Sequence, residues 1–291
     1  MNPFLKTYDT DQADHELIKS ALEGNRTAID RLLKKHQPFI YNIAWKMVRM
    51  PQDAEDLTQE ALLKITLNLS KFQFKSNFRT WAYRIVVNHF LNSTKKPSEK
   101  SISGFDYMVE GLEATPDVEL TELEIKEQEH LIREMNLMCM SGMLLCLNRE
   151  QRMIYIIGEM FGADHNVGSE IMNMSKDNFR AKLSKARKDL FNFMNNQCGL
   201  VNKDNPCRCY KKVTAAVNGG FIDAKNLLFN HKDYSTFKRE IQKDADYMLE
   251  FADKNYIALY DGMSYRQGFD KKTFIKDILD NMKVKKAMNL N

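Results

Sequence analysis

The sequence predicts an all-α protein, because apolar residues recur at helical spacing in two separate stretches and helical segments fill the region before residue 93. The first row comprises Ala54, Leu57, Ala61, Ile65 and Leu69. The second comprises Phe179, Leu183, Ala186 and Leu190. Positions three or four residues apart share one side of a helix, so each row is expected to be buried.

The chain begins with a polar segment, and we expect residues 1–14 to form a flexible N-terminus. Two short helices then run to about Lys35, with a break near Gly24. Pro38 is expected to open a further helix that ends before Pro51, because proline suits the first turn of a helix. With the helix over 53–69 and another starting near Asn77, residues 15–93 form a compact helical domain.

Charged residues lie beside the first apolar row. Asp53, Asp56 and Glu60 share one exposed face, and Lys64 continues that row of charges. The segment after Leu69 is basic and aromatic and breaks the helical period. In the next helix we assign Phe78 and Trp81 to the core, because large aromatic side chains usually serve packing.

Charge is distributed unevenly. Residues 71–100 carry seven Lys or Arg against one acid, residues 101–134 carry ten acids against two bases, and residues 176–212 carry ten bases against three acids. Two basic blocks flanking an acidic connector are typical of a protein that binds a polyanion. Pro, Gly and Ser mixed with charge predict a flexible linker over residues 94–118.

A second helical domain is predicted over residues 119–197. A long apolar helix ends at Leu147 and is interrupted near Ser141, and a further helix starts at Arg149. Ser175 is a suitable N-cap for the helix that carries the second apolar row. The rest of that helix is polar and cationic, which is what a helix-turn-helix recognition helix needs in the major groove.

Residues 198–291 form a Cys-containing extension with a helical pattern from about Ala215, apolar positions between 230 and 270, and a final helix near 271–288. Cys198, Cys207 and Cys209 predict either a structural zinc site or free, buried thiols. A fourth zinc ligand would come from a candidate set of His165, His231, Cys139 and Cys146. The odd total of five cysteines argues against a disulfide framework.

Two strings in the chain resemble a known family. DAEDLTQEALLKI followed by FRTWAYRIVVN resembles region 2 of the extracytoplasmic-function sigma factors of bacterial RNA polymerase, and the run from Leu147 to Arg187 resembles region 4. One position departs from the pattern, because Gly168 stands where an apolar residue is usual in the first helix of the region 4 motif. Glycine weakens a helix interior, so that helix is expected to be short or irregular.

The resemblance implies that region 2 docks on the clamp of the largest polymerase subunit and captures the melted −10 element. It implies that region 4 binds the flap of the second-largest subunit and reads the −35 element. The residues implied to face polymerase are Asp53, Asp56, Gln59 and Glu60. Those implied to contact −10 DNA are Lys71, Lys75, Asn77, Arg79, Arg84 and Asn88. Those implied to contact −35 DNA are Ser175, Lys176, Asn178, Arg180 and Lys182.

Phe72, Phe74 and Tyr83 are either stacking platforms for extruded bases or core residues. An anti-sigma protein is a further candidate partner, and the extension is a candidate regulator in cis.

The predicted function is therefore promoter-specific transcription initiation in the bacterial cytoplasm, without catalysis or a required cofactor. No Gly-rich phosphate loop or nucleophile-base set indicates an enzyme, and an enzyme that uses the cysteine cluster is the least favoured alternative. No apolar run approaches the roughly 18 residues that span a bilayer, and the N-terminus lacks signal-peptide features. The main alternative is a metal- or redox-responsive helix-turn-helix repressor that acts without polymerase.

Overall fold

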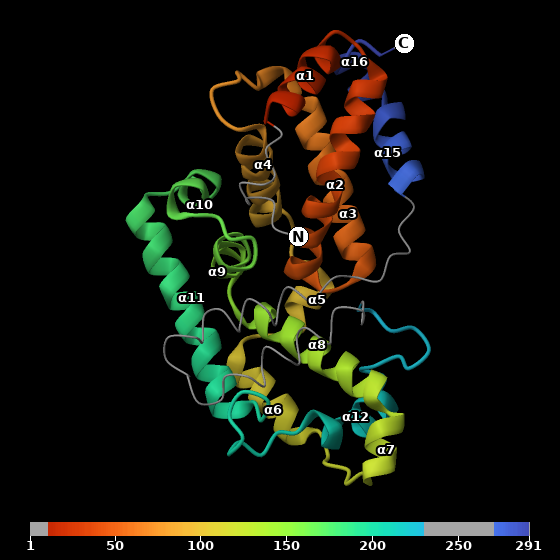
Figure 1. The fold of residues 1–291 in the computed structure, drawn as a ribbon, viewed down its shortest axis with the longest axis vertical. Helices are drawn as coiled ribbons and strands as arrows, with labels where there is room; N and C mark the ends of the chain where they lie inside the picture. Colours follow the sequence, from red (N-terminus) through yellow and green to blue (C-terminus); the bar gives the residue numbers. More distant parts are fainter. Residues whose placement is uncertain (1–10, 230–270, 291) are drawn as a thin grey trace. The chain divides into compact units, whose positions relative to one another are not determined.

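The computed structural model describes residues 11–229 and 271–290, which are helical apart from turns and loops (Figure 1). Within these ranges β-structure is limited to isolated bridge positions, which are Cys198 and Cys207, paired with each other, and Phe229. The predicted all-α class is therefore confirmed. None of the helices in these two ranges has the length and apolar character that a bilayer crossing requires.

The chain divides into two compact units that each combine separate parts of the sequence. Unit 1 comprises Met1–Lys96, Ile156–Lys182 and Gly268–Asn291, and unit 2 comprises Pro97–Tyr155 and Leu183–Gln267. The division passes through one helix, α11 (Lys176–Gln197), whose first residues belong to unit 1. The domain boundaries expected from the sequence stay predictions.

Unit 1 is built around three long helices, α2, α3 and α4. Its elements are α1 (Asp11–Leu22), α2 (Arg26–Val48), α3 (Pro51–Leu67), the 3-10 turn Leu69–Lys71, α4 (Phe78–Asn92), the π-helical turn Ile156–Met160, α10 (His165–Ile171), α15 (Lys271–Asp280) and α16 (Met282–Ala287). The apolar row predicted on α3 is buried, with every member at most 2% exposed. Asn77 caps α4 by accepting a hydrogen bond from the Arg79 amide, as the start predicted near Asn77 requires.

Two expectations for the start of unit 1 were wrong. Pro38 lies inside α2 and does not open a helix. Helix α2 buries Leu32 and Leu33 before the proline and Phe39 and Ile40 after it, and this burial on both sides offsets the about 3 kcal/mol that an interior proline costs.

The predicted flexible N-terminus is also wrong for residues 11–14. Asp14 is fully buried, and its carboxylate lies 2.5 Å from Lys35 Nζ and 3.1 Å from His36 Nε2. These two contacts from α2 hold the first turn of α1 in place. Residues 1–10 lie outside the described residues.

The helices of unit 2 differ from the predicted ones at two places. They are α5 (Pro97–Lys100), α6 (Phe105–Ala114), α7 (Glu122–Glu127), α8 (Glu129–Cys146), α9 (Arg149–Tyr155), the later part of α11, and α12 (Cys209–Asn218). Helices α5 and α6 lie in the segment predicted to be an irregular linker; Phe105 of α6 packs on Phe193 of α11 with ring centroids 5.2 Å apart. The predicted interruption at Ser141 is absent, because the buried α8 continues through it, and the break falls at Gln128.

The C-terminal extension is helical only in part among the described residues. After α12, residues 219–229 form turns, although Ile222 is 3% exposed and packs with Met135 and Val213. The single helix predicted near 271–288 is two helices, because Asn281 ends α15 and its side chain caps α16. The apolar pattern predicted between 230 and 270 lies outside the described residues.

Candidate nucleic-acid interface

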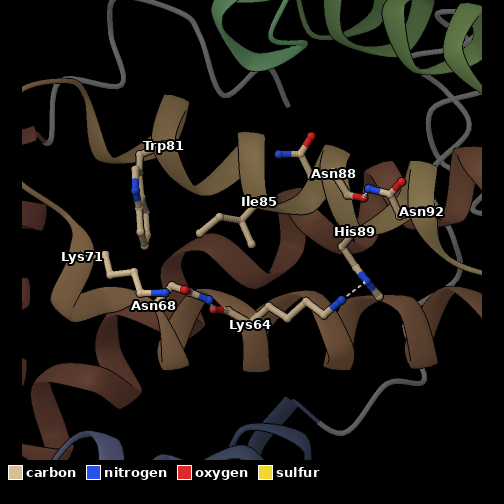
Figure 2. Close-up of a pocket in the computed structure, with 8 residues that line it drawn as sticks. All are labelled: Lys64, Asn68, Lys71, Trp81, Ile85, Asn88, His89 and Asn92. Carbon is tan, nitrogen blue, oxygen red and sulfur yellow. Dashed lines mark hydrogen bonds between the residues drawn. The ribbon is translucent and has the colours of Figure 1, made fainter.

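A pocket of about 370 Å³ lies between α3 and α4 in unit 1 (Figure 2). Two helical faces form its walls. The residues that line it are Lys64, Asn68, Lys71, Trp81, Ile85, Asn88, His89 and Asn92. On α4, Trp81, Ile85, Asn88 and Asn92 recur every three or four positions and share one face of that helix, and His89 adjoins Asn88. The pocket thus combines cationic, amide and aromatic side chains on a rigid helix pair.

Trp81 is the large apolar surface of this pocket, and Figure 2 shows it extending from α4 toward α3. Phe72 and Phe78 pack against Trp81, with ring centroids 5.4 and 5.7 Å from that of the indole. Phe72 and Phe78 are 4% and 1% exposed, whereas Trp81 is only half-buried. The assignment of Phe78 to the core is confirmed, and Trp81 combines a packed side with a face on the pocket.

The opposite wall of the pocket carries positive charge. Lys64 and Lys71 are exposed, and Lys64 Nζ lies 2.8 Å from His89 Nδ1. Because an ammonium group only donates, Nδ1 of His89 is the acceptor, and its Nε2–H faces Glu60 Oε2 at 3.2 Å. This chain of contacts fixes the imidazole at the pocket edge. Cations beside an aromatic face are the combination that single-stranded nucleic acid binds.

The residues implied to contact −10 DNA divide into groups. Lys71 and Asn88 line the pocket, whereas Lys75 and Asn77 belong to the loop before α4 and its cap. Arg79 is 7% exposed, so it offers little surface in this conformation. Arg84 Nη2 donates to Glu170 Oε1 of α10 at 2.9 Å. The roles of all six residues stay predictions.

Sequence reasoning missed most of the pocket residues. Lys64, Asn68, Trp81, Ile85, His89 and Asn92 were not among the predicted DNA contacts. The helical spacing of Trp81, Ile85, Asn88 and Asn92 is a signal that could have found the α4 wall. Of the three alternative stacking residues, Phe72 and Tyr83 are buried, at 4% and 1% exposure, and Phe74 is half-buried.

The acidic row on α3 remains at the surface of unit 1. The side chains of Asp56 and Glu60 are 61% and 56% exposed, and Asp53 and Gln59 are half-buried. Lys96 Nζ lies 3.2 Å from Asp56 and 4.0 Å from Asp53. A basic protein surface could replace Lys96 at these carboxylates, so the row suits the predicted polymerase contact.

Helices α10 and α11 are joined by a short turn, as a helix-turn-helix motif requires. Asp164 caps α10 by accepting from the amides of Asn166 and Val167. Asn173 in the turn has φ of 52°, in the left-handed region that asparagine tolerates. The Ser175 hydroxyl oxygen accepts a hydrogen bond from the Asn178 amide at 3.3 Å, which confirms Ser175 as a cap of α11.

The packing of this motif explains why residue 168 is a glycine. A Cβ atom at this position would lie 2.3 Å from Cζ of Phe179, far inside van der Waals contact. Phe179 is fully buried, and its ring therefore packs directly on the backbone of α10. The departure from the family pattern gives a short helix, as predicted, and it makes room for an aromatic side chain from α11.

The residues implied to read −35 DNA are on the outer side of α11 near its start. Lys176, Asn178 and Arg180 are exposed, Lys182 is half-buried, and the four members of the predicted apolar row are at most 3% exposed. Arg180 Nη1 lies 3.5 Å from Asp177 Oδ1, a contact in which both side chains remain mostly exposed. Lys176, Asn178 and Arg180 therefore lie at the surface of α11, as contact with a DNA groove requires.

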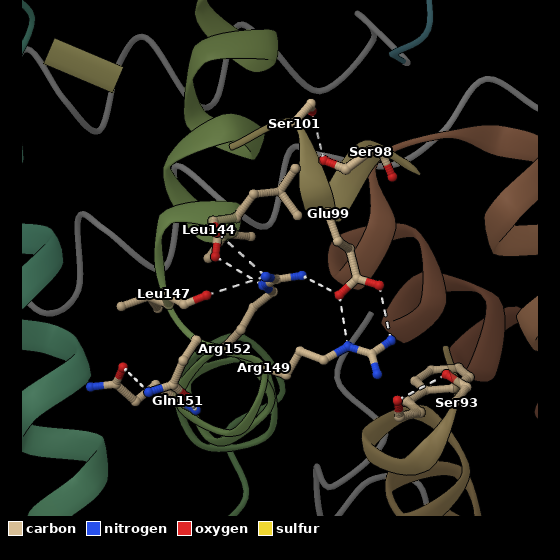
Figure 3. A network of polar contacts seen from close by, with 12 residues as sticks. Ser93, Ser98, Glu99, Ser101, Leu144, Leu147, Arg149, Gln151 and Arg152 are labelled. Atoms are coloured by element: carbon tan, nitrogen blue, oxygen red, sulfur yellow. Dashed lines mark hydrogen bonds and ion pairs between the residues drawn. The ribbon is translucent and has the colours of Figure 1, made fainter. Parts of the chain in front are cut away.

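A buried polar network ties α5 to the start of α9 in unit 2 (Figure 3). Arg149 donates from Nε and Nη2 to the two carboxylate oxygens of Glu99, at 2.8 and 2.9 Å, and Arg152 Nη1 donates to Oε1 at 3.1 Å. Arg152 also donates to the carbonyl oxygens of Leu144, Leu145 and Leu147. Burial lowers the pKa of Arg152 to about 10, and the negative charge of Glu99 opposes this shift. The network is therefore a structural support.

The cysteines give the zinc hypothesis no support. Among the described residues, no group of three or more His, Cys, Asp or Glu side chains is arranged to hold a metal ion. Burial raises the pKa values of Cys198, Cys207 and Cys209, and their proximity to other cysteines adds to the shift for Cys207 and Cys209. All three are free, half-buried thiols in the structure. His231 lies outside the described residues.

Comparison with known proteins gives one family match and several relatives. Residues 32–98 match the family model "Sigma-70 region 2". The chain is 30% identical over 125 residues to the RNA polymerase sigma-H factor of Pseudomonas aeruginosa, covering 41% of this chain and 65% of that protein. It is 29% identical over 86 residues to the extracytoplasmic-function factor SigM of Mycobacterium tuberculosis, covering 30% and 44%.

A third relative is the extracytoplasmic-function factor SigW of Bacillus subtilis, which is 29% identical over 79 residues, covering 27% of this chain and 42% of that protein. The chain therefore spans less than two thirds of the length of these curated relatives. The matched residues 32–98 include the whole of α3 and α4, so the pocket lies inside the part of the chain that the family model describes.

Proposed function

We propose that this chain is an alternative sigma factor of the sigma-70 family, of extracytoplasmic-function type, which directs promoter-specific transcription initiation. The match of residues 32–98 to sigma-70 region 2 and the likeness to the relatives above support this proposal. The chain binds core RNA polymerase in the cytoplasm and has no catalytic role of its own. The relatives named above are all RNA polymerase sigma factors, and none of them favours the repressor alternative.

The observation that carries this proposal is the pocket between α3 and α4. Opening promoter DNA costs about a few kcal/mol per unstacked base, and this cost must be offset by contacts that only the open strand makes. Trp81 offers a stacking face, and Lys64 and Lys71 offer charges for phosphate groups. The pocket therefore suits an unstacked base of the −10 element and its adjacent backbone.

The finer assignments form part of the same proposal. The acidic row of α3 binds the clamp of the largest polymerase subunit, and the predicted region 4 binds the flap of the second-largest subunit. Arg180 and its neighbours on α11 read the −35 element. The exposure of Asp56 and Glu60 on α3, and of Lys176, Asn178 and Arg180 on α11, supports these roles. A separate anti-sigma protein is an additional candidate partner.

A reconstituted transcription assay tests the proposal. Core RNA polymerase from the same bacterium is combined with genomic promoter fragments, with and without the protein, and run-off transcripts are measured. We expect transcripts that require the protein. The proposal fails if the protein binds the fragments but neither joins core polymerase nor starts transcripts.

Variants then test the pocket itself. Trp81→Ala is expected to weaken binding to single-stranded −10 DNA by about 1–3 kcal/mol, the usual contribution of one stacked base. Tyr107→Ala is the matched control, because Tyr107 is an aromatic side chain that is 50% exposed on α6 and does not line the pocket. Equal effects of the two substitutions on DNA binding would contradict the assignment of the pocket.

A further inference from the structure

The imidazole of His89 lies at the edge of the pocket, between two side chains of opposite charge. Lys64 and Glu60, both on α3, face its two ring nitrogens. Lys64 Nζ lies 2.8 Å from Nδ1, and Glu60 Oε2 lies 3.2 Å from Nε2. Figure 2 shows the Lys64 side chain extending along α3 to the imidazole. The three groups thus form one chain of contacts between α3 and α4, two helices that pack on each other.

The contact with Lys64 determines which ring nitrogen carries the proton. An ammonium group donates hydrogen bonds and accepts none, so Nδ1 of His89 must present a lone pair to it. The proton of the neutral ring is then on Nε2, where it faces the Glu60 carboxylate. The partner of one ring nitrogen selects the tautomer that the other nitrogen presents. Glu60 therefore favours the tautomer that accepts from Lys64.

His89 also stands between two charges that would otherwise attract each other directly. Glu60 and Lys64 are four positions apart on α3, a spacing at which an acid and a base commonly pair. In the structure each of them faces a different nitrogen of the imidazole. The ammonium is therefore bound to a neutral acceptor, and its charge stays available to an anion. An ammonium group has three donors, so the bond to His89 leaves two for a ligand.

The imidazole is a fixed anchor for a side chain that is otherwise exposed. The side chain of His89 is 4% exposed, whereas Lys64 is exposed. A lysine side chain has several rotatable bonds and loses conformational entropy when it is held in one position. A bond to a buried ring restrains the ammonium before a ligand arrives, so less of this entropy is lost on binding. The pocket thus presents a restrained cation together with the face of Trp81.

Single-stranded DNA is the ligand that this combination fits. Lys64 and Trp81 line the same pocket, one on each of its two walls. A base that stacks on the indole carries its own sugar and phosphate, and a cation in the same pocket can bind that phosphate. The strength of such a contact depends on where the ammonium is held, and His89 is the side chain that holds it.

We propose that His89 is a positioning residue for promoter opening, which holds the Lys64 ammonium where it binds a phosphate of the unstacked strand. The inference rests on the proposed sigma function, and it adds a residue that acts on DNA through another side chain. Glu60 supports this role by selecting the accepting tautomer of the ring.

Two substitutions at residue 89 separate the two ring contacts. Oδ1 of asparagine is bonded to Cγ, as Nδ1 of histidine is, so His89→Asn keeps an acceptor for Lys64. The amide of glutamine lies one bond further out, like Nε2, so His89→Gln keeps a group near Glu60 and loses that acceptor. If His89 served only to fill space, the smaller asparagine would do more damage than glutamine. Rescue by His89→Asn therefore distinguishes positioning from packing.

The assay measures binding of the full chain to a fluorescent single strand by anisotropy. The strand carries the −10 sequence of a promoter found in the run-off assay. We expect His89→Gln to weaken binding about twofold to tenfold, the usual effect of losing one hydrogen bond, and His89→Asn to retain most of the affinity. His130→Asn, at an exposed position of α8, is the matched control and should have no effect. Equal binding by all three variants, or a larger loss in His89→Asn, overturns the inference.

Substitutions of the two pocket lysines show whether His89 acts through Lys64. Lys64→Met and Lys71→Met each remove one charge from the pocket and keep an apolar side chain. Each should lower the slope of log affinity against log salt by about 0.7, the value for one phosphate contact on a single strand. Added to Lys64→Met, His89→Gln should cause no further loss of affinity; added to Lys71→Met, it should cause its full loss. Equal losses in both backgrounds overturn the inference.

A measurement without DNA separates this inference from the sigma assignment. Proton–nitrogen NMR spectra of the imidazole distinguish protonation at Nδ1 from protonation at Nε2, and loss of a signal in His89→Asn identifies His89. We expect an Nε2–H ring whose Nδ1 signal shifts in Lys64→Met. An Nδ1–H ring overturns the inference while the sigma assignment stands. If the wild type neither starts transcripts nor joins core polymerase, the sigma assignment fails, and the inference fails with it.

Discussion

Replacing Gly168 with alanine tests whether the contact between α10 and α11 explains the unusual glycine. In an unobstructed helix interior, this substitution stabilises by up to about 1 kcal/mol. At Gly168 the new Cβ would lie 2.3, 2.7 and 2.8 Å from three ring carbons of Phe179. Carbon atoms prefer a separation of about 3.5–4.0 Å, so the buried ring or α10 would have to move by about 1 Å.

Overpacking of this kind costs about 1–3 kcal/mol, which exceeds the gain in helix propensity. We therefore expect Gly168→Ala to lower the free energy of unfolding by about 1–2 kcal/mol. The control is Gly111→Ala in α6, where a new Cβ atom would meet no other atom within 4 Å and the substitution should stabilise. Urea denaturation followed by circular dichroism measures both.

A double-mutant cycle sharpens the test. Phe179→Leu removes the ring atoms that the new methyl group meets, so Gly168→Ala should cost less in that background. We expect a coupling free energy of about 0.5–3 kcal/mol between the two substitutions. Additive effects, or a Gly168→Ala variant as stable as the wild type, would refute the explanation.

Three further predictions concern charged groups. Glu99→Ala should lower the free energy of unfolding by about 3–5 kcal/mol, because it leaves the buried Arg152 guanidinium without its carboxylate. Glu99→Gln should lower it by less. Equal unfolding midpoints for both variants would contradict this. Burial alone would raise the pKa of Asp14, but hydrogen bonds and charge from His36 and Lys35 outweigh it and hold the pKa below its ordinary value. The stabilisation by the Asp14 carboxylate is therefore fully present above about pH 4 and is lost as pH falls through the lowered pKa of the folded state. In urea titrations, the stability advantage of the wild type over Asp14→Asn should shrink below about pH 4. An advantage that stays constant down to the acid limit would argue against this. Glu170→Gln removes the carboxylate that pairs with Arg84. Because both side chains of this pair are about 40% exposed, we expect the substitution to tighten binding to single-stranded −10 DNA by at most about fivefold. The control Glu110→Gln changes the net charge equally on α6 and should have no effect on this binding.

Local periodicity made part of this structure readable from the sequence. The buried rows of α3 and α11 and the caps Asn77 and Ser175 were predicted, because each depends on neighbours within one or two turns. Pro38 was wrongly assigned to a helix start, because its place in the structure depends on contacts beyond its neighbours in sequence. Its local preference marks a helix start, but packing of both halves of α2 against the same core outweighs that preference.

The remaining errors come from contacts between distant residues. Glu99 lies in a segment that is polar and rich in helix breakers, and its order depends on two arginines about fifty positions later. Trp81 was assigned to the core because the sequence alone does not show which side of α4 faces α3 across the pocket. The docking of α15 on α2 links Arg26 to Asp280, and no pattern within either helix indicates its partner.

The separation between Arg26 and Asp280 also affects how the protein is made. The two residues are 254 positions apart, and ribosomes add about 5–20 residues per second. The apolar surface of α2 and α3 that α15 and α16 cover therefore emerges on the order of ten to fifty seconds before those two helices are synthesised. During translation each new chain passes through an interval in which this apolar surface is open to chaperones and to aggregation.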